Sequence, residues 1–511
     1  MTNPSLIEFI RKQLNRWLDW LDNLEQKSPR SQKQAWYRIE YHLPPSIVAV
    51  VSAILLYFSL FLGADLTLGQ ALVLTLFVAI MVSLFCVYMV RDHADLVKDG
   101  DAMALLAVIF FTTILLIKAV AFLSQKYYWL SPYATPIAIA PLLTALLLRQ
   151  RLAMLLAFVV AILFGIVNDF SLPVTLVGAV GGVTIVAAGS QARTAHRVAR
   201  AGLMAGFLQM LIVVFLAISL DWGHEYTAIA MVSSFLSGIV AAVFSLGVLP
   251  YLESFFSRVS NLRLLELADV NHPLLHRMSI EAPGTYHHSL IVASLAEDAA
   301  NAVGANGLLC RVGAYFHDIG KMTKAEYFIE NQGAFGNPHD QVSPSLSKLV
   351  ITSHVKEGLA LAKAYKLDKQ VADFIPQHHG TSQIEFFYQK ALQAEEKEEE
   401  GEKEPVMEET YRYPGPKPQS KEAGIVMLSD SIEAASRTLE EPNHQRYKDL
   451  VYKIINKKLF DGQLNETPLT LKDLHLLAER FTATLTSIHH ARVPYPELEN
   501  PKKKDDMPSF Q

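Results

Sequence analysis

Histidine and carboxylate side chains that could hold metal ions recur through the second half of this sequence. The segment GAYFHDIGKM (313–322) sets His317 next to Asp318 after an apolar stretch and adds Lys321. Five further segments contribute histidines or an isolated carboxylate: GTYHHS (284–289), NPHD (337–340), ITSHV (351–355), PQHHGTS (376–382) and IVMLSDSIEAA (425–435). Each segment alone is weak evidence, because a lone histidine is more often a hydrogen-bonded polar residue than a metal ligand.

Taken together, the residue types in these segments favour a pair of transition-metal ions. A set of imidazoles with two carboxylates suits Mn or Fe better than a single structural zinc, which normally draws on cysteine. A carboxylate such as Asp318 can bridge two ions, whereas an imidazole cannot. Two ions about 3.5–4 Å apart can hold a hydroxide for in-line attack and neutralise charge on a phosphoryl group. The ligand types therefore predict hydrolysis of a phosphoester.

The composition describes a chain with one apolar and one polar half. Hydrophobic residues make up 51% of the 511 positions, and the mean hydropathy of +0.23 is higher than that of an average soluble enzyme. The formal net charge of −5 gives no basis for nucleic-acid binding, so no nucleic acid is expected as a partner. Cys86 and Cys310 are too few for a disulfide framework, which indicates a reducing compartment for the polar half.

Apolar runs in the first half have the length that a helix needs to cross a bilayer, about 17–24 residues. We expect about eight spans within residues 46–250, with the lipid bilayer as a partner. The expected spans are 46–64, 68–90, 103–124, 133–149, 152–168, 172–190, 203–220 and 227–250. The fourth contains Pro136 and Pro141, which predicts a kink or a position inside the bundle.

The loops between these runs differ in positive charge. Arginine and lysine concentrate before the first span and in alternate loops, the last of which is RTAHRVAR (193–200). The intervening loops, such as NDFS (168–171) and DWGHEYT (221–227), are short and poorer in positive charge. The positive-inside rule therefore predicts that the N-terminus and the C-terminal domain both lie in the cytoplasm.

The remaining segments have simpler patterns. Residues 1–45 are expected as a cytoplasmic amphipathic segment, either on the membrane surface or against a partner. Residues 251–280 are expected as a helical connector, and 281–495 as a domain of amphipathic helices with almost no alternating strand pattern. The acidic run 394–410 is expected as a solvated insertion, and 496–511 as a disordered tail. The predicted fold class is all-α: a polytopic transmembrane helix bundle followed by an all-helical cytoplasmic domain.

With these features in view, the sequence resembles the HD-domain phosphohydrolases, and more narrowly the seven-transmembrane HD proteins that hydrolyse cyclic di-AMP. The resemblance covers about residues 68–495. Its motifs are ELADVNHPLLHRMSIEAPGTYHHS (266–289), GAYFHDIGK (313–321), YFIENQ (327–332), NPHD, QHHGTS and YRYPGPKPQSKE (411–422). It implies an HD domain anchored in a bacterial cell membrane that converts the cyclic dinucleotide cyclic di-AMP to linear pApA.

The resemblance also implies which residues bind two divalent ions, Mn or Fe. One ion takes His288, His317, Asp318 and Asp430; the other takes Asp318, His354, His378 and His379. Asp318 would thus bridge the two. His287 is an alternative first ligand, although the family register favours the histidine directly before Ser289.

Catalytic and substrate-binding roles are implied for a few more side chains. Lys321 lies three residues after Asp318, so on a continuing helix it would share that face and could contact a substrate phosphate or the leaving oxygen. Arg412 and Lys417, within YRYPGPKP, could bind the second phosphate or an adenine edge. Two residues of the NPHD segment are expected to fix a loop rather than bind metal: His339 and Asp340.

Alternatives remain open from sequence. The same chemistry could act on another nucleotide, although the Gly-Tyr-Pro motif that follows HHG in cyclic di-GMP enzymes is replaced here by HHGTSQIEFFY (378–388). A non-catalytic membrane receptor that binds a nucleotide is the other alternative, and a homodimer is one possible assembly. Spans 46–64 and 68–90 leave no room between them for the large extracytoplasmic domain common in this family, which puts extracellular ligand sensing in doubt.

Overall fold

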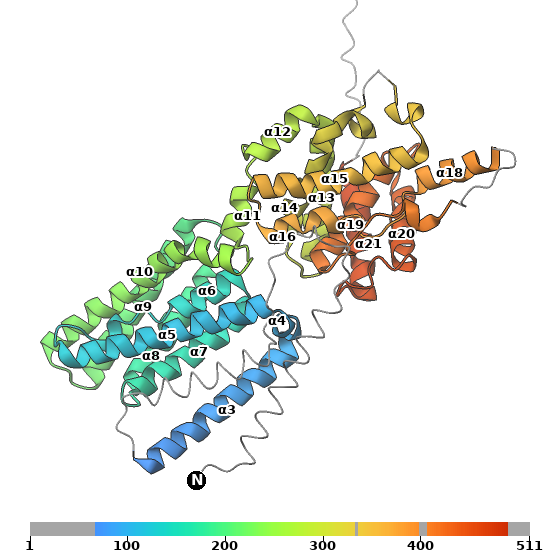
Figure 1. The fold of residues 1–511 in the computed structure, drawn as a ribbon. Coiled ribbons are helices and arrows are strands. Elements are labelled where there is room, and N and C mark those ends of the chain that lie inside the picture. The colour runs from blue at the N-terminus through green and yellow to red at the C-terminus, as the bar shows by residue number, and fades with distance from the viewer. Residues whose placement is uncertain (1–66, 333–335, 398–405, 489–511) are drawn as a thin grey trace, which may run out of the picture.

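The computed structural model describes residues 67–332, 336–397 and 406–488, and in these ranges the chain is built from helices (Figure 1). The extended pairing found there is one isolated bridge between Gln383 and Arg412. The predicted all-α fold class is therefore confirmed. The predicted N-terminal segment 1–45, first span 46–64 and tail 496–511 lie outside the described residues.

Among residues 67–260, six helices are long and apolar enough to cross a membrane: α3 (Leu68–Asp92), α5 (Gly100–Lys126), α7 (Gln150–Val167), α8 (Leu172–Gly189), α9 (Ala195–Ser219) and α10 (His224–Phe255). A short helix, α4 (Ala94–Lys98), joins the first two. Small residues let these helices approach closely. A Cβ added to Gly238 on α10 would lie 2.4 Å from the backbone nitrogen of Gly206 on α9, so side chains larger than hydrogen are excluded at this crossing.

The segment predicted as the fourth span has a different structure. It folds as a 3-10 turn, η1 (Pro132–Ala134), and a nine-residue helix, α6 (Ile139–Leu147), with Pro136 between them. Nine residues extend about 14 Å, half the thickness of a bilayer core. Every residue of α6 is buried, so this helix packs inside the bundle and does not cross the membrane beside the other helices.

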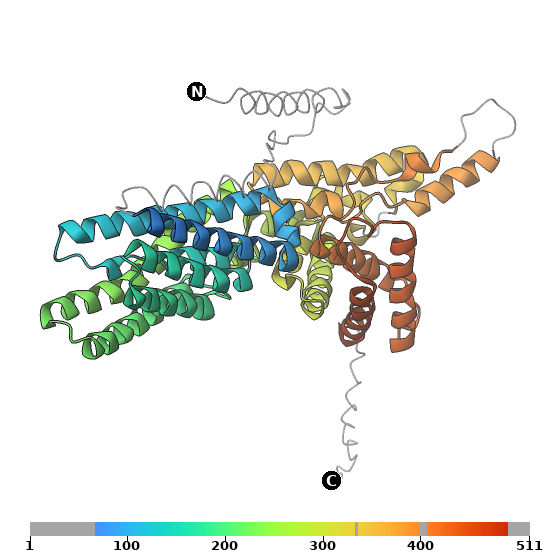
Figure 2. The same ribbon diagram turned by 90° about the horizontal axis from the view of Figure 1, so that it is seen from below.

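The bundle and the C-terminal domain lie end to end, joined by the last turn of α10 and two short helices (Figures 1 and 2). The connector helices are α11 (Asn261–Leu267) and α12 (Pro273–Glu281). Ser260 begins α11: its hydroxyl accepts a hydrogen bond from the Arg263 amide, while its own amide donates to Glu253 on α10 over 2.9 Å. The cap therefore fixes the angle at which the chain leaves the bundle.

The C-terminal domain has nine helices in the described ranges: α13 (Pro283–Ala302), α14 (Gly307–Phe316), α15 (Pro344–Ala364), α16 (Lys369–Ala372), α17 (Phe374–Gln377), α18 (Glu385–Lys397), α19 (Lys421–Ser436), α20 (His444–Phe460) and α21 (Leu471–Ile488). Four 3-10 turns connect them: η2 (Ile319–Tyr327), η3 (Ile329–Asn331), η4 (Pro338–Gln341) and η5 (Glu408–Tyr411). The core lies where α13, α14, α19 and α21 meet, around Phe316 and Phe481, both fully buried. Part of the predicted acidic loop is helical, since α18 continues to Lys397.

Candidate metal centre

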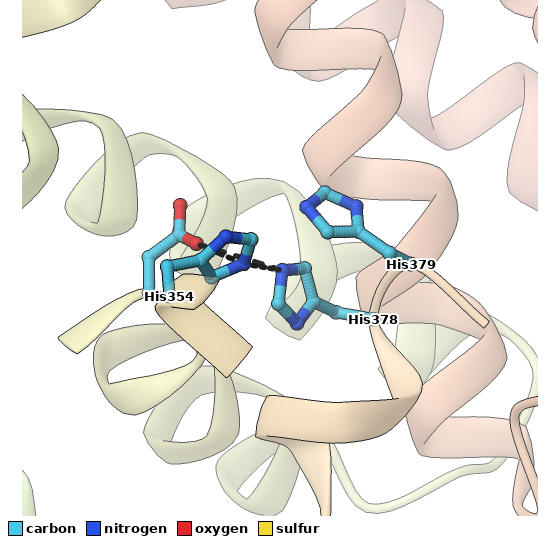
Figure 3. Close-up of side chains that lie close together, drawn as sticks. His354, His378 and His379 are labelled. Atoms are coloured by element: carbon cyan, nitrogen blue, oxygen red, sulfur yellow. Dashed lines mark hydrogen bonds and ion pairs between the residues drawn. The ribbon is translucent and has the colours of Figure 1, made fainter. Parts of the chain in front are cut away.

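Five elements of the C-terminal domain bring the predicted ligands together. His288 comes from α13 and Asp430 from α19, while His317 and Asp318 directly follow α14. His354 comes from α15. The tandem histidines follow α17: His378 and His379. Figure 3 shows His354 and His378 facing each other with His379 beside them.

These side chains form two groups whose ligand atoms lie within 4.8 Å of one another. The groups are His288, His317, Asp318 and Asp430, and Asp318, His354, His378 and His379. Asp318 belongs to both, and the grouping is the one that the resemblance implies. His287 is exposed and belongs to neither group, so the structure brings His288 and not its neighbour into the cluster.

Each of the two carboxylate oxygens of Asp318 faces a different one of the two ligand groups. Oδ2 lies 3.2 Å from His317 Nε2 and 3.7 Å from His288 Nε2. Oδ1 lies 3.6 Å from His354 Nε2 and 3.5 Å from His378 Nε2. A carboxylate oriented in this way can contribute one oxygen to each of two cations.

Each histidine around Asp318 is held by its other ring nitrogen. Nδ1 of three of them donates to the carbonyl three residues earlier: His317 to Ala314 over 2.7 Å, His354 to Ile351 over 2.6 Å and His378 to Ile375 over 2.8 Å. Nδ1 of His288 instead lies 2.5 Å from a Glu433 oxygen. Such bonds fix the tautomer and leave Nε2 as the ligating atom, as is usual for metal-binding histidines.

Glycine allows the elements to meet at this point. A Cβ on Gly320, two residues after Asp318, would lie 1.8 Å from the carbonyl oxygen of His354. A Cβ on Gly358, one turn further along α15, would lie 2.9 Å from Ile375 on α17. The backbone of the His-Asp turn can therefore press against α15, which brings His354 to Asp318.

Burial and charge shift the pKa values of His317 and His354 in opposite directions. Burial disfavours charge throughout, but contacts with Asp318 and Asp430 outweigh it at His317 and raise its pKa to about 10. At His354 burial prevails and lowers the pKa to about 3. The pKa of Asp318 is well below its usual range, because His317 and Lys321 outweigh the effect of burial. The carboxylates are thus ionised, as ligation of a cation requires.

Two buried atoms at the centre call for a cation. Within the described residues, His317 Nε2 and Asp318 Oδ1 are buried and make no hydrogen bond of standard geometry. An unpaired buried polar atom costs about 1–3 kcal/mol. Imidazole and carboxylate donors converging on a buried point suit divalent transition metals, so the residues present fit the metal that the sequence predicts.

Lys321 contacts the cluster through a geometry that differs from the predicted one. Helix α14 ends at Phe316, and Lys321 lies in the following 3-10 turn, where residues three apart are eclipsed. Its amine lies 2.7 Å from Asp318 Oδ2 and donates to Glu330 over 3.0 Å. Burial opposes a charge on Lys321, but Asp318 and Glu330 outweigh it and raise its pKa, so the amine stays protonated.

Three residues beside the cluster were missed in the sequence. Glu433 holds His288; it follows Asp430 at i+3 on α19, a spacing that places both on one helix face. The ring of Tyr413 packs against His379, with centroids 4.2 Å apart. Lys458, on α20, donates to Ser382 over 2.7 Å, and burial lowers its pKa to about 8. The spacing of Glu433 was a usable signal, whereas Tyr413 and Lys458 approach only through the fold.

The remaining predicted residues lie outside both ligand groups. Arg412 is bound by protein partners: Glu408 at 2.6 Å, Asp461 at 2.9 Å and the Thr381 carbonyl at 2.9 Å. Lys417 Nζ lies beside Gly462. His339 is buried and donates from Nε2 to the Tyr327 carbonyl over 3.0 Å, and Asp340 pairs with Lys390. The last two contacts are those expected of loop-fixing residues.

Two family models match the chain in sequence order. Residues 68–260 match the family described as 7TM receptor with intracellular HD hydrolase, and residues 285–435 match the HD domain. The cyclic-di-AMP phosphodiesterase PgpH of Bacillus subtilis is 40% identical over 430 residues, which cover 82% of this chain. This chain belongs to the seven-transmembrane HD family. As a member of the seven-transmembrane HD family it is a multi-pass membrane protein with a divalent-metal site in its HD domain.

The chain matches only part of the length of its relatives. The cyclic-di-AMP phosphodiesterase PgpH of Listeria monocytogenes is 33% identical over 426 residues, 83% of this chain. The matched regions span 59% of the Bacillus protein and 58% of the Listeria protein. A crystal structure of the Listeria PgpH HD domain in complex with cyclic-di-AMP is 41% identical, covers 43% of this chain and 100% of the crystallised one, and has a TM-score of 0.41.

Proposed function

We propose that this protein is a membrane-anchored, metal-dependent phosphodiesterase that hydrolyses cyclic di-AMP to linear pApA. One water is added, one 3′–5′ phosphodiester P–O bond breaks, and the product keeps the other linkage. The substrate proposal is supported by the Bacillus and Listeria relatives, both named cyclic-di-AMP phosphodiesterases. The chemistry is supported by the paired ligand groups in the HD domain.

The orientation of Asp318 is the observation that carries this proposal. One of its oxygens faces His288 and His317, and the other faces His354 and His378. We infer two divalent ions, Mn or Fe, bridged by this carboxylate. Asp430 completes one ligand set and His379 the other. When bound, two such ions acidify water and neutralise charge on a phosphoryl group.

The protein's own groups would orient the substrate and hold protons. Lys321 stays protonated beside Asp318, so its amine can donate to a substrate phosphate or to the leaving oxygen. Lys417 and Arg412 are proposed to bind the second phosphate or an adenine edge. Arg412 would have to exchange Glu408 or Asp461 for the nucleotide, since both carboxylates contact it in the free protein.

The charge bias of the loops supports a location in a bacterial cell membrane with both termini and the HD domain in the cytoplasm. In this orientation the HD domain would meet nucleotides of the cytoplasm. For the domain limits we keep 1–45, 46–250, 251–280, 281–495 and 496–511. A homodimer remains one possible assembly of this anchored form.

The proposal is tested by measuring turnover with the full chain in lipid nanodiscs loaded with Mn²⁺ or Fe²⁺. Cyclic di-AMP and cyclic di-GMP are incubated side by side, and linear products are quantified by chromatography. His288→Ala and the double change of His317 and Asp318 to alanine should abolish turnover. The matched control is His287→Ala, which removes an exposed imidazole from the next position and should leave turnover unchanged.

Each outcome has a distinct meaning. Formation of pApA that depends on His288 but not on His287 supports both the site and the substrate. Bound metal without hydrolysis of cyclic di-AMP would retain the ligand assignment and reject the substrate. Tight cyclic di-AMP binding without turnover at any metal load would favour a receptor over an enzyme.

A further inference from the structure

A cavity lies among residues at the end of the membrane bundle where α5 ends and α9 turns into α10. Figure 1 shows that this end is far from the HD domain. The cavity has a volume of about 370 Å³, within the range of small-molecule sites. Its walls come from the ends of α5, α7, α8, α9 and α10 and from the turn η1. Because the loops at this end are poor in positive charge, it faces the side opposite the proposed catalytic site.

Three aromatic rings line one side of this cavity. Trp222 lies between Tyr133 and Tyr226, with ring centroids 6.0 Å and 5.1 Å away, and the Trp222–Tyr226 contact is edge to face. Tyr133 is only 2% exposed and lies in the η1 turn, whose first residue is capped by Ser131. The rings are therefore held by the bundle before any ligand arrives.

Tyr133 differs from the aromatic residues that anchor helices at a membrane surface, whereas Tyr226 is 42% exposed. Such a belt faces outward, as Tyr128 and Trp129 do in the neighbouring loop, where they are 83% and 59% exposed. Tyr133 is buried, and its ring contacts that of Trp222 beside it. An outward-facing belt does not explain the position of Tyr133, a buried ring that lines an open volume.

Polar side chains and one carboxylate also line the cavity. Asn168, Asp169 and Ser171 line it, at the connection between α7 and α8. Asp169 and Phe170 both have positive φ, 57° and 56°, a conformation that non-glycine residues rarely adopt. Among the described lining residues Asp169 is the carboxylate, and none is lysine, arginine or histidine.

We propose that this cavity binds the ammonium group of a small organic amine. Aromatic faces attract a cation through their quadrupoles, and a carboxylate at the same cavity supplies the opposite charge. Two sources carry this chemistry: a soluble amine, or the ethanolamine headgroup of a neighbouring lipid. The site goes beyond the proposed phosphodiesterase activity and lies on other helices.

The test measures binding of radiolabelled choline to the full chain in phosphatidylglycerol nanodiscs. Saturable binding is expected, and Trp222→Leu and Asp169→Asn should each weaken it at least tenfold. Trp129→Leu removes an exposed ring from the same end and should change binding less than twofold. Uncharged 3,3-dimethylbutanol, which has the shape of choline, should not compete.

A second set of nanodiscs containing phosphatidylethanolamine distinguishes the two sources. Weaker choline binding there, restored to the phosphatidylglycerol value by diluting the ethanolamine lipid, assigns the headgroup; equal binding assigns a soluble amine. Equal competition by the uncharged isostere, or equal binding by the Asp169→Asn and Trp222→Leu variants, would overturn the proposal. Folding of each variant is checked by the turnover of the HD domain, so loss of choline binding with turnover intact is specific to the cavity.

Discussion

Arg263 Nε donates to Asp368 over 2.9 Å, and this ion pair ties the connector helix α11 to the N-cap residue of α16. Helix α16 leads into α17, and His378 directly follows α17. On the other side of the connector, Arg258 pairs with Asp99 at the start of α5. Charged contacts thus run from the membrane bundle through the connector to the element that positions a metal ligand.

Breaking the Arg263–Asp368 pair should loosen the HD domain from its connector. Asp368→Asn keeps the shape but removes the charge, and we expect a loss of about 1 kcal/mol, because the pair is partly buried and hydrogen-bonded. Urea unfolding followed by the fluorescence of a probe in the HD domain measures it. Asp373→Asn, which breaks the exposed pair with Lys369, is the control and should cost less.

Single ligand substitutions should separate the two proposed ions. His354→Gln disrupts one ligand group and Asp430→Asn the other, whereas Asp318→Asn disrupts both. Elemental analysis of purified protein should therefore give about one ion per chain for each of the first two variants and close to none for the third. Loss of all metal in His354→Gln would mean that the intact group, which contains His288 and Asp430, cannot hold an ion alone.

Much of this site could be predicted from the sequence because its ligands occur as short motifs. His317 and Asp318 are adjacent, as are His378 and His379, so the local chain keeps each pair together whatever the tertiary structure. The helical class followed from apolar periodicity. The grouping of ligands came from resemblance, since spacing alone does not state which distant elements meet.

What the sequence did not predict depends on tertiary packing. The short helix α6 looks like a membrane span because apolar residues are required both in lipid and in a buried bundle interior. The sequence predicted that Lys321 would lie near Asp318 on a continuing α-helix. The two residues do lie together, but a 3-10 turn brings them there. The sequence gives no indication that Arg412 pairs with Asp461, which lies 49 positions away.

Removing the carboxylate behind His288 should weaken the metal without removing a ligand. Glu433 accepts from His288 Nδ1 and is itself held by Arg437 over 2.7 Å. Glu433→Gln should lower metal affinity about 10–100-fold, the usual cost of losing such a supporting partner. Competition with a fluorescent chelator measures the change. Glu297→Gln, which loses a surface contact to Arg311, should bind metal like the wild type.

Kinetics and stability together should reveal the role of Arg412. If its guanidinium binds substrate, Arg412→Lys raises KM for cyclic di-AMP and leaves the melting temperature nearly unchanged. If it serves to join Asp461, Glu408 and the Thr381 carbonyl, the variant loses about 1–3 kcal/mol of stability, since a lysine cannot reproduce the forked contacts. From the contacts in the free protein we expect the loss of stability to be the larger effect.

Lys458 should make stability depend on pH in the alkaline range. Burial lowers its pKa from 10.5 to about 8, so between these values the unfolded chain binds more protons than the folded one, and stability rises with pH across that window. Below pH 8 the folded amine is charged and the destabilisation is complete.

Lys458→Met should remove a rise on the order of 1–3 kcal/mol. Unfolding of the full chain is compared at pH 8 and 10 with Lys457→Met, an exposed neighbour whose loss should keep the rise. Equal slopes in both variants would show that Lys458 is not the group responsible.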